Sequence, residues 1–259
     1  MRRPRPLPPQ LASRPFSVSE ASAAGVSRRR TRADDLAAPF HGVRAASAAP
    51  RSVAALCAAY EARMSPAQYF SHGTAAELYQ FPIRARGPRL LHVSVTVPAH
   101  PPQTLGVKGH RLAEGTVVVT RGGVRLVSAE VAWCQLAGRL SHNDIVVVGD
   151  FLVRRKRPLS SLAKLRATVD ALGAVRGVRA MRRALEDVRA GTDSPMETRV
   201  RLLLVAGGLP EPVIQFAVKD ADGFFVATPD LAYVKERIAI EYEGEIHRSS
   251  GICGGYRPP

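Results

Sequence analysis

Acidic side chains interrupt an apolar run near the C-terminal end of the sequence, where residues 229–247 read PDLAYVKERIAIEYEGEIH. The alternation of IAIEYEG (238–244) predicts a strand with Glu241 and Glu243 on one face. Asp230 lies on the preceding apolar segment, and a turn at 234–237 would bring it close to Glu241. Carboxylates gathered on one face repel one another unless a cation lies between them, and Mg²⁺ prefers carboxylate oxygens. The pattern therefore predicts a site for Mg²⁺ (or Mn²⁺) with Asp230 and Glu241 as ligands.

The elements that must position these acids begin with SPMETRVRLLLVAGGL (194–209), which is typical of an amphipathic helix. Ser194 is expected to cap this helix, with Pro195 at its first position and Glu197 at its third. Apolar segments that follow it predict an antiparallel meander, and a helix followed by such a meander is an α+β pattern. The predicted strands are VIQFAVK (213–219), FFVATPDLAY (224–233, broken near Pro229) and IAIEYEG (238–244).

This arrangement resembles the PD-(D/E)xK restriction-endonuclease-like superfamily. The resemblance is carried by Pro229-Asp230, ten intervening residues and Glu241-Tyr242-Glu243. Residues 194–248 are similar to actinobacterial proteins that have a very-short-patch-repair-like endonuclease domain. The upstream part, from about Pro15 onward, resembles the type IV abortive-infection antitoxin, which begins with a winged helix-turn-helix.

The resemblance implies a role for each acid. Asp230 and Glu241 match the metal-binding acids, and Glu243 stands in the place of the superfamily's lysine. Glu197 matches an acid on the first helix of the domain, and His247 matches a histidine that follows the strand. The implied activity is hydrolysis of DNA phosphodiester bonds by a metal-bound water, in repair or defence.

Each of these assignments has a structural alternative. Glu197 lies three residues after Ser194, so it could serve only in a capping box. Asp230 could be a turn residue, because Pro-Asp is common in turns. Glu243 could face solvent at the end of a strand, and His247 could be a surface histidine. Glu241, flanked by two apolar side chains, is the hardest to explain without a metal.

The N-terminal part is basic. Residues 1–14 are rich in proline and arginine, which predicts a disordered tail. The following SVSEASAAGVSRRRTRADDLA (17–37) predicts two short helices around a turn at Gly25, so we expect a helix-turn-helix-like region over 15–60. Its second helix would carry a DNA-binding cluster of arginines, and the alternative is a solvated basic helix. The four candidates are Arg28, Arg29, Arg30 and Arg32.

The middle region, 61–192, is expected to form a mixed α/β domain without a catalytic constellation, and the resemblance implies that this domain is antitoxin-like. A strand is expected at 90–98, a hairpin at 116–128 turning at Gly122-Gly123, and helices at 129–140, 144–155, 161–172 and 178–191. The histidines of this region show no metal-ligand spacing, so most are expected to be surface or capping residues. They are His72, His92, His100, His110 and His142.

Composition favours a nucleic-acid partner. The net charge is +15, and the excess of Lys and Arg lies before the slightly acidic C-terminal quarter. A basic chain attracts DNA by counterion release, although an Arg-rich composition could also reflect a GC-rich genome. The 3 cysteines are far apart, which argues against disulfides or a Cys-based zinc site and favours a reducing cytoplasm. The sequence contains no apolar run of about 18 residues, so it predicts no membrane-spanning helix.

The end of the sequence, 249–259, has neither helical nor strand periodicity and predicts an unstructured tail. It resembles a truncation or a reading-frame change, which would leave the endonuclease-like domain (193–248) incomplete and could abolish its activity. The alternatives are a DNA-binding, antitoxin-like regulator with a degenerate nuclease domain, whose toxin partner the sequence does not identify, and an inactive structural remnant.

Overall fold

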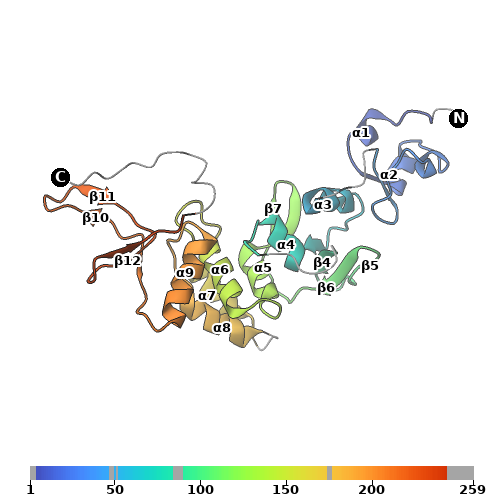
Figure 1. Cartoon of the computed structure of the whole chain (residues 1–259). Coiled ribbons are helices and arrows are strands. Elements are labelled where there is room, and N and C mark those ends of the chain that lie inside the picture. Colours follow the sequence, from blue (N-terminus) through green and yellow to red (C-terminus); the bar gives the residue numbers. More distant parts are fainter. Residues whose placement is uncertain (1–3, 47–49, 51, 84–89, 174–176, 244–259) are drawn as a thin grey trace. The chain divides into compact units, whose positions relative to one another are not determined.

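The fold is α+β, with helices beside several separate sheets (Figure 1). The computed structural model describes residues 4–46, 50, 52–83, 90–173 and 177–243. The chain divides into two compact units: unit 1 comprises 1–140 and 166–182, and unit 2 comprises 141–165 and 183–259. Helices α7 (Leu162–Ala171) and α8 (Val178–Asp187) run through the boundaries of this division. Within the described ranges, no helix is long and apolar enough to cross a membrane.

Unit 1 is built on a six-stranded sheet with the strand order β5-β6-β4-β3-β8-β7. Parallel pairs join β4 to β6 and β3 to β8, and the other neighbours are antiparallel. The buried side chains of β4 and the fully buried Trp133 belong to its core. The strands are β3 (Gln68–Phe70), β4 (Leu91–Val95), β5 (Gln103–Thr104), β6 (Val107–Arg111), β7 (Val118–Arg121) and β8 (Val124–Val127); the helices are α3 (Val53–Glu61), α4 (His72–Leu78) and α5 (Ala129–Leu136).

Several elements of this unit were predicted correctly from local features of the sequence. The expected strand at 90–98 is β4, and the hairpin β7–β8 turns at Gly122 and Gly123, whose φ angles of 55° and 81° suit a type I′ turn. Strands β3 and β6 and helix α4 were not expected. All three are short, and the two strands are held in the sheet by long-range pairing rather than by their composition.

The N-terminal part differs from expectation in two ways. It contains α1 (Pro9–Ala12), β1 (Phe16–Ser17) paired with β2 (Val43–Arg44), and α2 (Val18–Ala23). The prediction that 1–14 is disordered is wrong for Pro9–Ala12, which form α1, because Leu11 is buried in a small core with Phe16 and Ala21.

The first predicted helix of the helix-turn-helix is confirmed as α2, capped by Ser17. The second is wrong, because Arg30–Arg32 form only a short 3₁₀ turn, η1. Only Thr31 in this turn is buried, so an α-helix here would have no apolar face to pack.

In unit 2, helix α6 (His142–Leu152) packs against α9 (Pro195–Ala206). A fully buried ion pair joins them: the Arg201 Nη2 lies 3.0 Å from the Asp150 Oδ2. The same carboxylate accepts hydrogen bonds from the Thr198 hydroxyl at 2.9 Å and the Arg189 backbone N–H at 2.8 Å. A domain boundary was expected near residue 193, but Asp150 before it and Thr198 and Arg201 after it share one core. This core fixes the position of α9.

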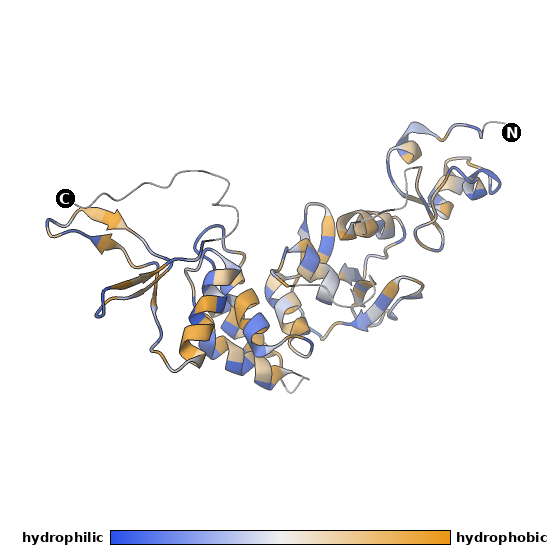
Figure 2. Ribbon diagram, viewed as in Figure 1, coloured by the Kyte–Doolittle hydropathy of each residue, from blue (hydrophilic) through white to orange (hydrophobic). Residues whose placement is uncertain are grey.

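The predicted three-strand meander is split into two small sheets. Strands β9 (Val213–Ile214), β12 (Leu231–Tyr233) and β13 (Ile238–Ile240) form an antiparallel sheet in the order β13-β12-β9. Strands β10 (Val218–Lys219) and β11 (Phe225–Ala227) form a separate pair. The expected strand 213–219 breaks at Gln215, whose φ of 52° is incompatible with a continuous strand. Figure 2 shows β11 as hydrophobic, and its residues are exposed.

Candidate functional site

The first acid of the candidate site lies at the start of α9. The Ser194 hydroxyl accepts a hydrogen bond from the Glu197 N–H at 3.2 Å, and Glu197 Oε2 accepts one from the Asp193 N–H at 2.8 Å. This reciprocal cap is the one that the Ser-Pro-x-Glu pattern predicts, displaced by one residue toward Asp193. Glu197 is only 4% exposed. Burial raises the pKa of its carboxyl, and the charges of Asp230 and Asp193 raise it further, against the hydrogen bonds to Asp193 and Ser194.

The second and third acids lie at the adjoining ends of β12 and β13. Leu231 pairs with Ile240, so the next positions outward are Asp230 and Glu241. Asp230 is half-buried, and its Oδ2 accepts a hydrogen bond from the Tyr242 N–H at 2.9 Å. Glu241 is exposed overall, but partial desolvation of its carboxyl raises its pKa, as do the charges of Asp230, Glu197 and Glu243, while a hydrogen bond with the Asp230 backbone opposes the rise. The predicted turn at 234–237 is present and makes this approach possible.

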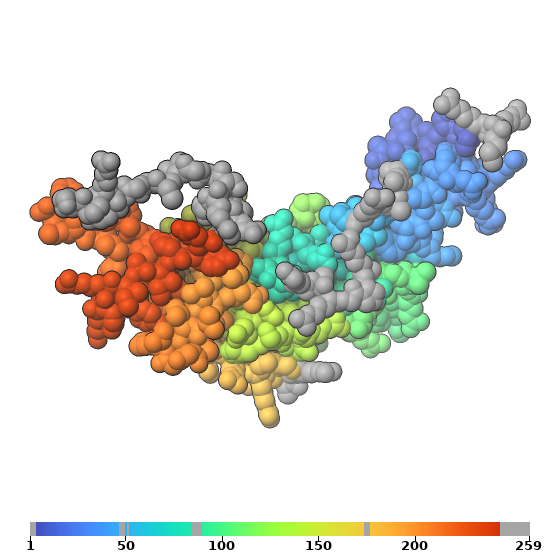
Figure 3. All heavy atoms as spheres, viewed as in Figure 1, coloured from blue at the N-terminus to red at the C-terminus, as the bar shows by residue number. Residues whose placement is uncertain are grey.

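The structure thus brings Glu197, Asp230 and Glu241 into one electrostatic neighbourhood, which we call the acid cluster. Figure 3 shows atoms of the C-terminal strands (red-orange) beside those of α9 (orange) on the face in view, consistent with the coupling of Glu197 to Asp230. The cluster is loose, because no three of its carboxylates within the described part of the chain have oxygens within 4.8 Å of one another. The carboxylate oxygens and the negative charge of the acid cluster still fit a hard divalent cation such as Mg²⁺.

Two predicted positions are placed differently from expectation. Strand β13 ends at Ile240, so the strand expected over 238–244 is shorter, and Glu241 and Glu243 lie beyond it as exposed residues. Glu243 contributes only its charge to the surroundings of Glu241. His247 lies outside the residues that the structure describes.

The predicted arginine cluster is divided. Arg28, Arg29 and Arg32 are exposed. Arg30 is half-buried, since two of its guanidinium nitrogens each donate to a carboxylate oxygen of Asp35 at 2.8 Å. Three of the four cations are therefore open to solvent, and Arg30 supports the local fold.

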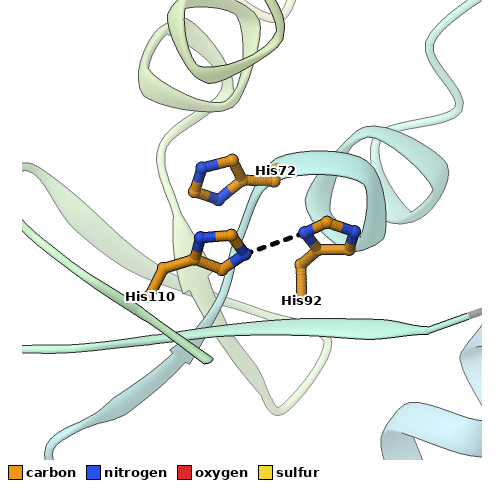
Figure 4. Close-up of side chains that lie close together, drawn as sticks. All are labelled: His72, His92 and His110. Atoms are coloured by element: carbon orange, nitrogen blue, oxygen red, sulfur yellow. Dashed lines mark hydrogen bonds between the residues drawn. The ribbon is translucent and has the colours of Figure 1, made fainter. Parts of the chain in front are cut away.

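A histidine cluster is present that the sequence did not reveal. His72 begins α4, His92 lies on β4 and His110 on β6, and one ring nitrogen from each lies within 4.8 Å of the others (Figure 4). The His92 Nδ1 and the His110 Nε2 are 2.9 Å apart. The His72 and His110 rings stack with centroids 3.9 Å apart. The spacing of these histidines along the chain did not predict the cluster, because it is the parallel pairing of β4 with β6 that places His110 beside Ser94, two residues from His92.

Burial also lowers the pKa values of the three imidazoles. The pKa of His72 falls to about 3 and that of His92 to about 4, first through burial and then through the neighbouring histidine charges. The pKa of His110 is lowered by burial and by the charges of Lys108 and Arg139. The cluster is therefore neutral at pH 7, with lone pairs on its ring nitrogens.

Comparisons with protein-family models and with curated proteins find no match to this chain. Among solved structures, the chain is similar to the RV2827C protein from Mycobacterium tuberculosis, with a TM-score of 0.46 and 14% sequence identity. The match covers 83% of this chain and 90% of that one.

Proposed function

We propose that the C-terminal part of this chain is a metal-dependent DNA endonuclease with a restriction-endonuclease-like core. One observation carries the proposal: Glu197 on α9, Asp230 before β12 and Glu241 after β13 come from three elements and act on one another electrostatically. The negative charge of Asp230 raises the pKa of both glutamates, and a divalent cation between the three carboxylates would neutralise their charge.

In this proposal, Asp230 and Glu241 hold Mg²⁺ or Mn²⁺, which would supply an activated water and stabilise charge on the phosphate. The protein's own contribution is to orient the ligands. The Tyr242 N–H fixes one oxygen of Asp230, and the Asp193 N–H fixes one oxygen of Glu197. Positive charge on the rest of the chain attracts the DNA backbone.

The test is cleavage of plasmid and mismatched duplex DNA by the full chain in Mg²⁺ or Mn²⁺. Asp230→Asn and Glu241→Gln are expected to lower the cleavage rate by about 100-fold or more, because each removes a metal-binding charge. Glu236→Gln is the matched control, since Glu236 is an exposed acid in the turn of the same hairpin. A wild-type chain that folds and binds DNA but cleaves none of these substrates would refute the proposal, as would equal rates in all variants.

The second candidate function is DNA binding by an antitoxin-like regulator, favoured by the exposure of Arg28, Arg29 and Arg32. Replacing all three with Gln should weaken DNA binding and reduce the slope of log K against log salt by about 1 for each phosphate that the variant no longer neutralises. Replacing three exposed arginines of α8 removes the same charge elsewhere and serves as the control: Arg179, Arg182 and Arg183. An equal decrease in affinity in both triple variants would show a non-specific charge effect and reject this DNA-binding surface.

A further inference from the structure

Three imidazoles from three different elements of unit 1 converge on one point of the six-stranded sheet (Figure 4). We propose that His72, His92 and His110 form a binding site for a divalent transition-metal ion, with Zn²⁺ as the ion that this ligand set fits best. Imidazole nitrogens are common zinc ligands, and three of them leave a fourth position open. The site is separate from the acid cluster in both ligand chemistry and place in the chain.

The distances suit a shared ion. Two nitrogens bound to one tetrahedral zinc at about 2.0–2.1 Å each lie about 3.3 Å apart. The His92 Nδ1 and the His110 Nε2 are 2.9 Å apart and face each other, with one proton between them when both rings are neutral. A small opening of this pair, with that proton moved to another ring nitrogen, admits the ion. The ligand nitrogen of His72 lies within 4.8 Å of both, so a modest ring rotation completes the set.

Groups around the cluster hold the imidazoles in position, as partners of metal ligands usually do. The His72 Nδ1 lies 3.0 Å from the hydroxyl of Ser71, which accepts a hydrogen bond from the Ser94 hydroxyl at 2.7 Å. Both serines are fully buried. When the Nδ1–H of His72 donates to Ser71, its Nε2 keeps a free lone pair for the ion. The His92 backbone N–H donates to the Thr74 hydroxyl at 2.7 Å, which fixes the strand beneath the second ligand.

The backbone at His72 gives a further sign of a specialised position. Its φ is 48°, in the left-handed region that non-glycine residues seldom adopt. The conformation is held by a hydrogen bond from the His72 N–H to Gln135 Oε1 at 2.8 Å. Strained residues of this kind gather at ligand sites.

The surrounding charge indicates what the open position accepts. The group of ligands contains no carboxylate, and Lys108 and Arg139 both act on the histidines. A zinc ion bound by neutral imidazoles keeps its full charge, so the fourth ligand is expected to be an anion or a deprotonated water, which the two cations also favour.

The test measures metal retained by the full chain after chelator treatment, loading with Zn²⁺ and dialysis. We expect about one Zn²⁺ per chain, and visible ligand-field absorption of a tetrahedral site when Co²⁺ replaces it. His92→Ala, His110→Ala and His72→Asn should each lower the affinity by about 100-fold or more. Asparagine is chosen at 72 because it tolerates a positive φ. His100→Ala, at an exposed histidine of the same unit, is the matched control.

Ser71→Ala keeps all three imidazoles and should weaken Zn²⁺ binding by about 10-fold, which tests the site even where a histidine variant fails to fold. Because the acid cluster is itself a proposed cation site, the histidine variants are also compared in an Asp230→Asn background, where they should still lower the Zn²⁺ affinity; failure of the nuclease proposal and failure of this one are thereby distinguishable. The proposal is overturned when the folded wild-type chain retains no Zn²⁺. Binding that survives in the histidine variants but disappears in His247→Ala or Cys253→Ser would overturn it too.

Discussion

The buried pair of Asp150 and Arg201 offers a sharp test of how unit 2 holds α9 in place. Asp150→Asn keeps the shape of the side chain but removes its charge, while Arg201 stays charged with only 2% of its side chain exposed. Removing one partner of a buried ion pair costs about 3–5 kcal/mol, because the other charge stays desolvated. Arg201 retains Glu211 and the Asp187 carbonyl as partners, so we expect about 3 kcal/mol, at the lower end of that range.

Substitution of the other partner should cost less. Burial raises the pKa of Asp150, and Arg201 is the largest of the influences that oppose this rise. In Arg201→Met the carboxyl can therefore take up a proton, whereas a guanidinium in Asp150→Asn cannot lose one. The pKa of Asp150 is already raised in the folded wild type, and loss of Arg201 raises it further, so the stability lost as pH rises through the folded pKa is larger in Arg201→Met than in the wild type. The stability deficit of this variant should shrink as the pH is lowered from 7 to 5.

The assay is guanidinium unfolding at pH 7 and pH 5, followed by far-UV circular dichroism and by hydrogen exchange of the α9 amides. Fluorescence of Trp133 reports on unit 1 and would not suffice. Glu211→Gln, which removes a part-exposed partner, is the control and should cost less than Asp150→Asn. The reasoning is refuted if Asp150→Asn costs below about 1 kcal/mol, or if Arg201→Met costs more than Asp150→Asn.

Three further predictions concern buried groups and a helix cap. Burial raises the pKa of Cys57 and Cys134 to about 12, so in a Cys253→Ser chain at pH 8 a thiol reagent should modify neither until guanidinium is added. Burial raises the pKa of Tyr79 to about 12 from 10, so the stability that this residue contributes below pH 10 is lost as the pH rises toward 12. In urea unfolding, Tyr79→Phe should therefore lose less free energy of unfolding between pH 9 and 11 than the wild type loses. Ser141→Ala removes the cap of α6 and should cost about 1 kcal/mol by thermal unfolding, while Ser141→Thr, which keeps a hydroxyl for the Asp144 N–H and carboxylate, should cost little.

Elements with a complete local signal could be predicted from the sequence. The cap at Ser194, the cap at Ser141 and the glycine turn at Gly122 are set by residues within four positions of one another, and all three are present. The approach of Asp230 to Glu241 was predictable for the same reason, because a four-residue turn joins their strands. Each of these correct predictions depends only on residues that lie close together in the sequence.

Elements that depend on burial or on distant pairing could not be predicted. An arginine-rich run after α2 was expected to be helical by analogy with a helix-turn-helix, but it has no apolar face to bury. The histidine cluster requires the parallel register of β4 and β6, which pairs Leu91 with Val107 and depends on a strand, β6, that the sequence did not reveal. Spacing along the chain is therefore a poor guide to ligands carried by different strands.

The two roles of Glu197 can be separated by one pair of substitutions. Glutamine is also accepted at the third position of a capping box, so Glu197→Gln keeps an acceptor for the Asp193 N–H and removes the charge. We expect its stability to lie within about 0.5 kcal/mol of wild type, because the missing carboxylate was buried beside other acids. Glu197→Ala loses the cap as well and should cost about 1 kcal/mol or more.

If Glu197 serves the acid cluster, both variants lose Mn²⁺ affinity to a similar degree, although only the alanine variant is destabilised. If Glu197 is a cap alone, Glu197→Gln binds Mn²⁺ as the wild type does. Mn²⁺ binding followed by electron paramagnetic resonance, beside thermal unfolding of the same samples, gives both quantities. Because burial and capping act on folding while charge acts on the cation, a glutamine variant that is stable but no longer binds Mn²⁺ would assign the carboxylate to the metal site.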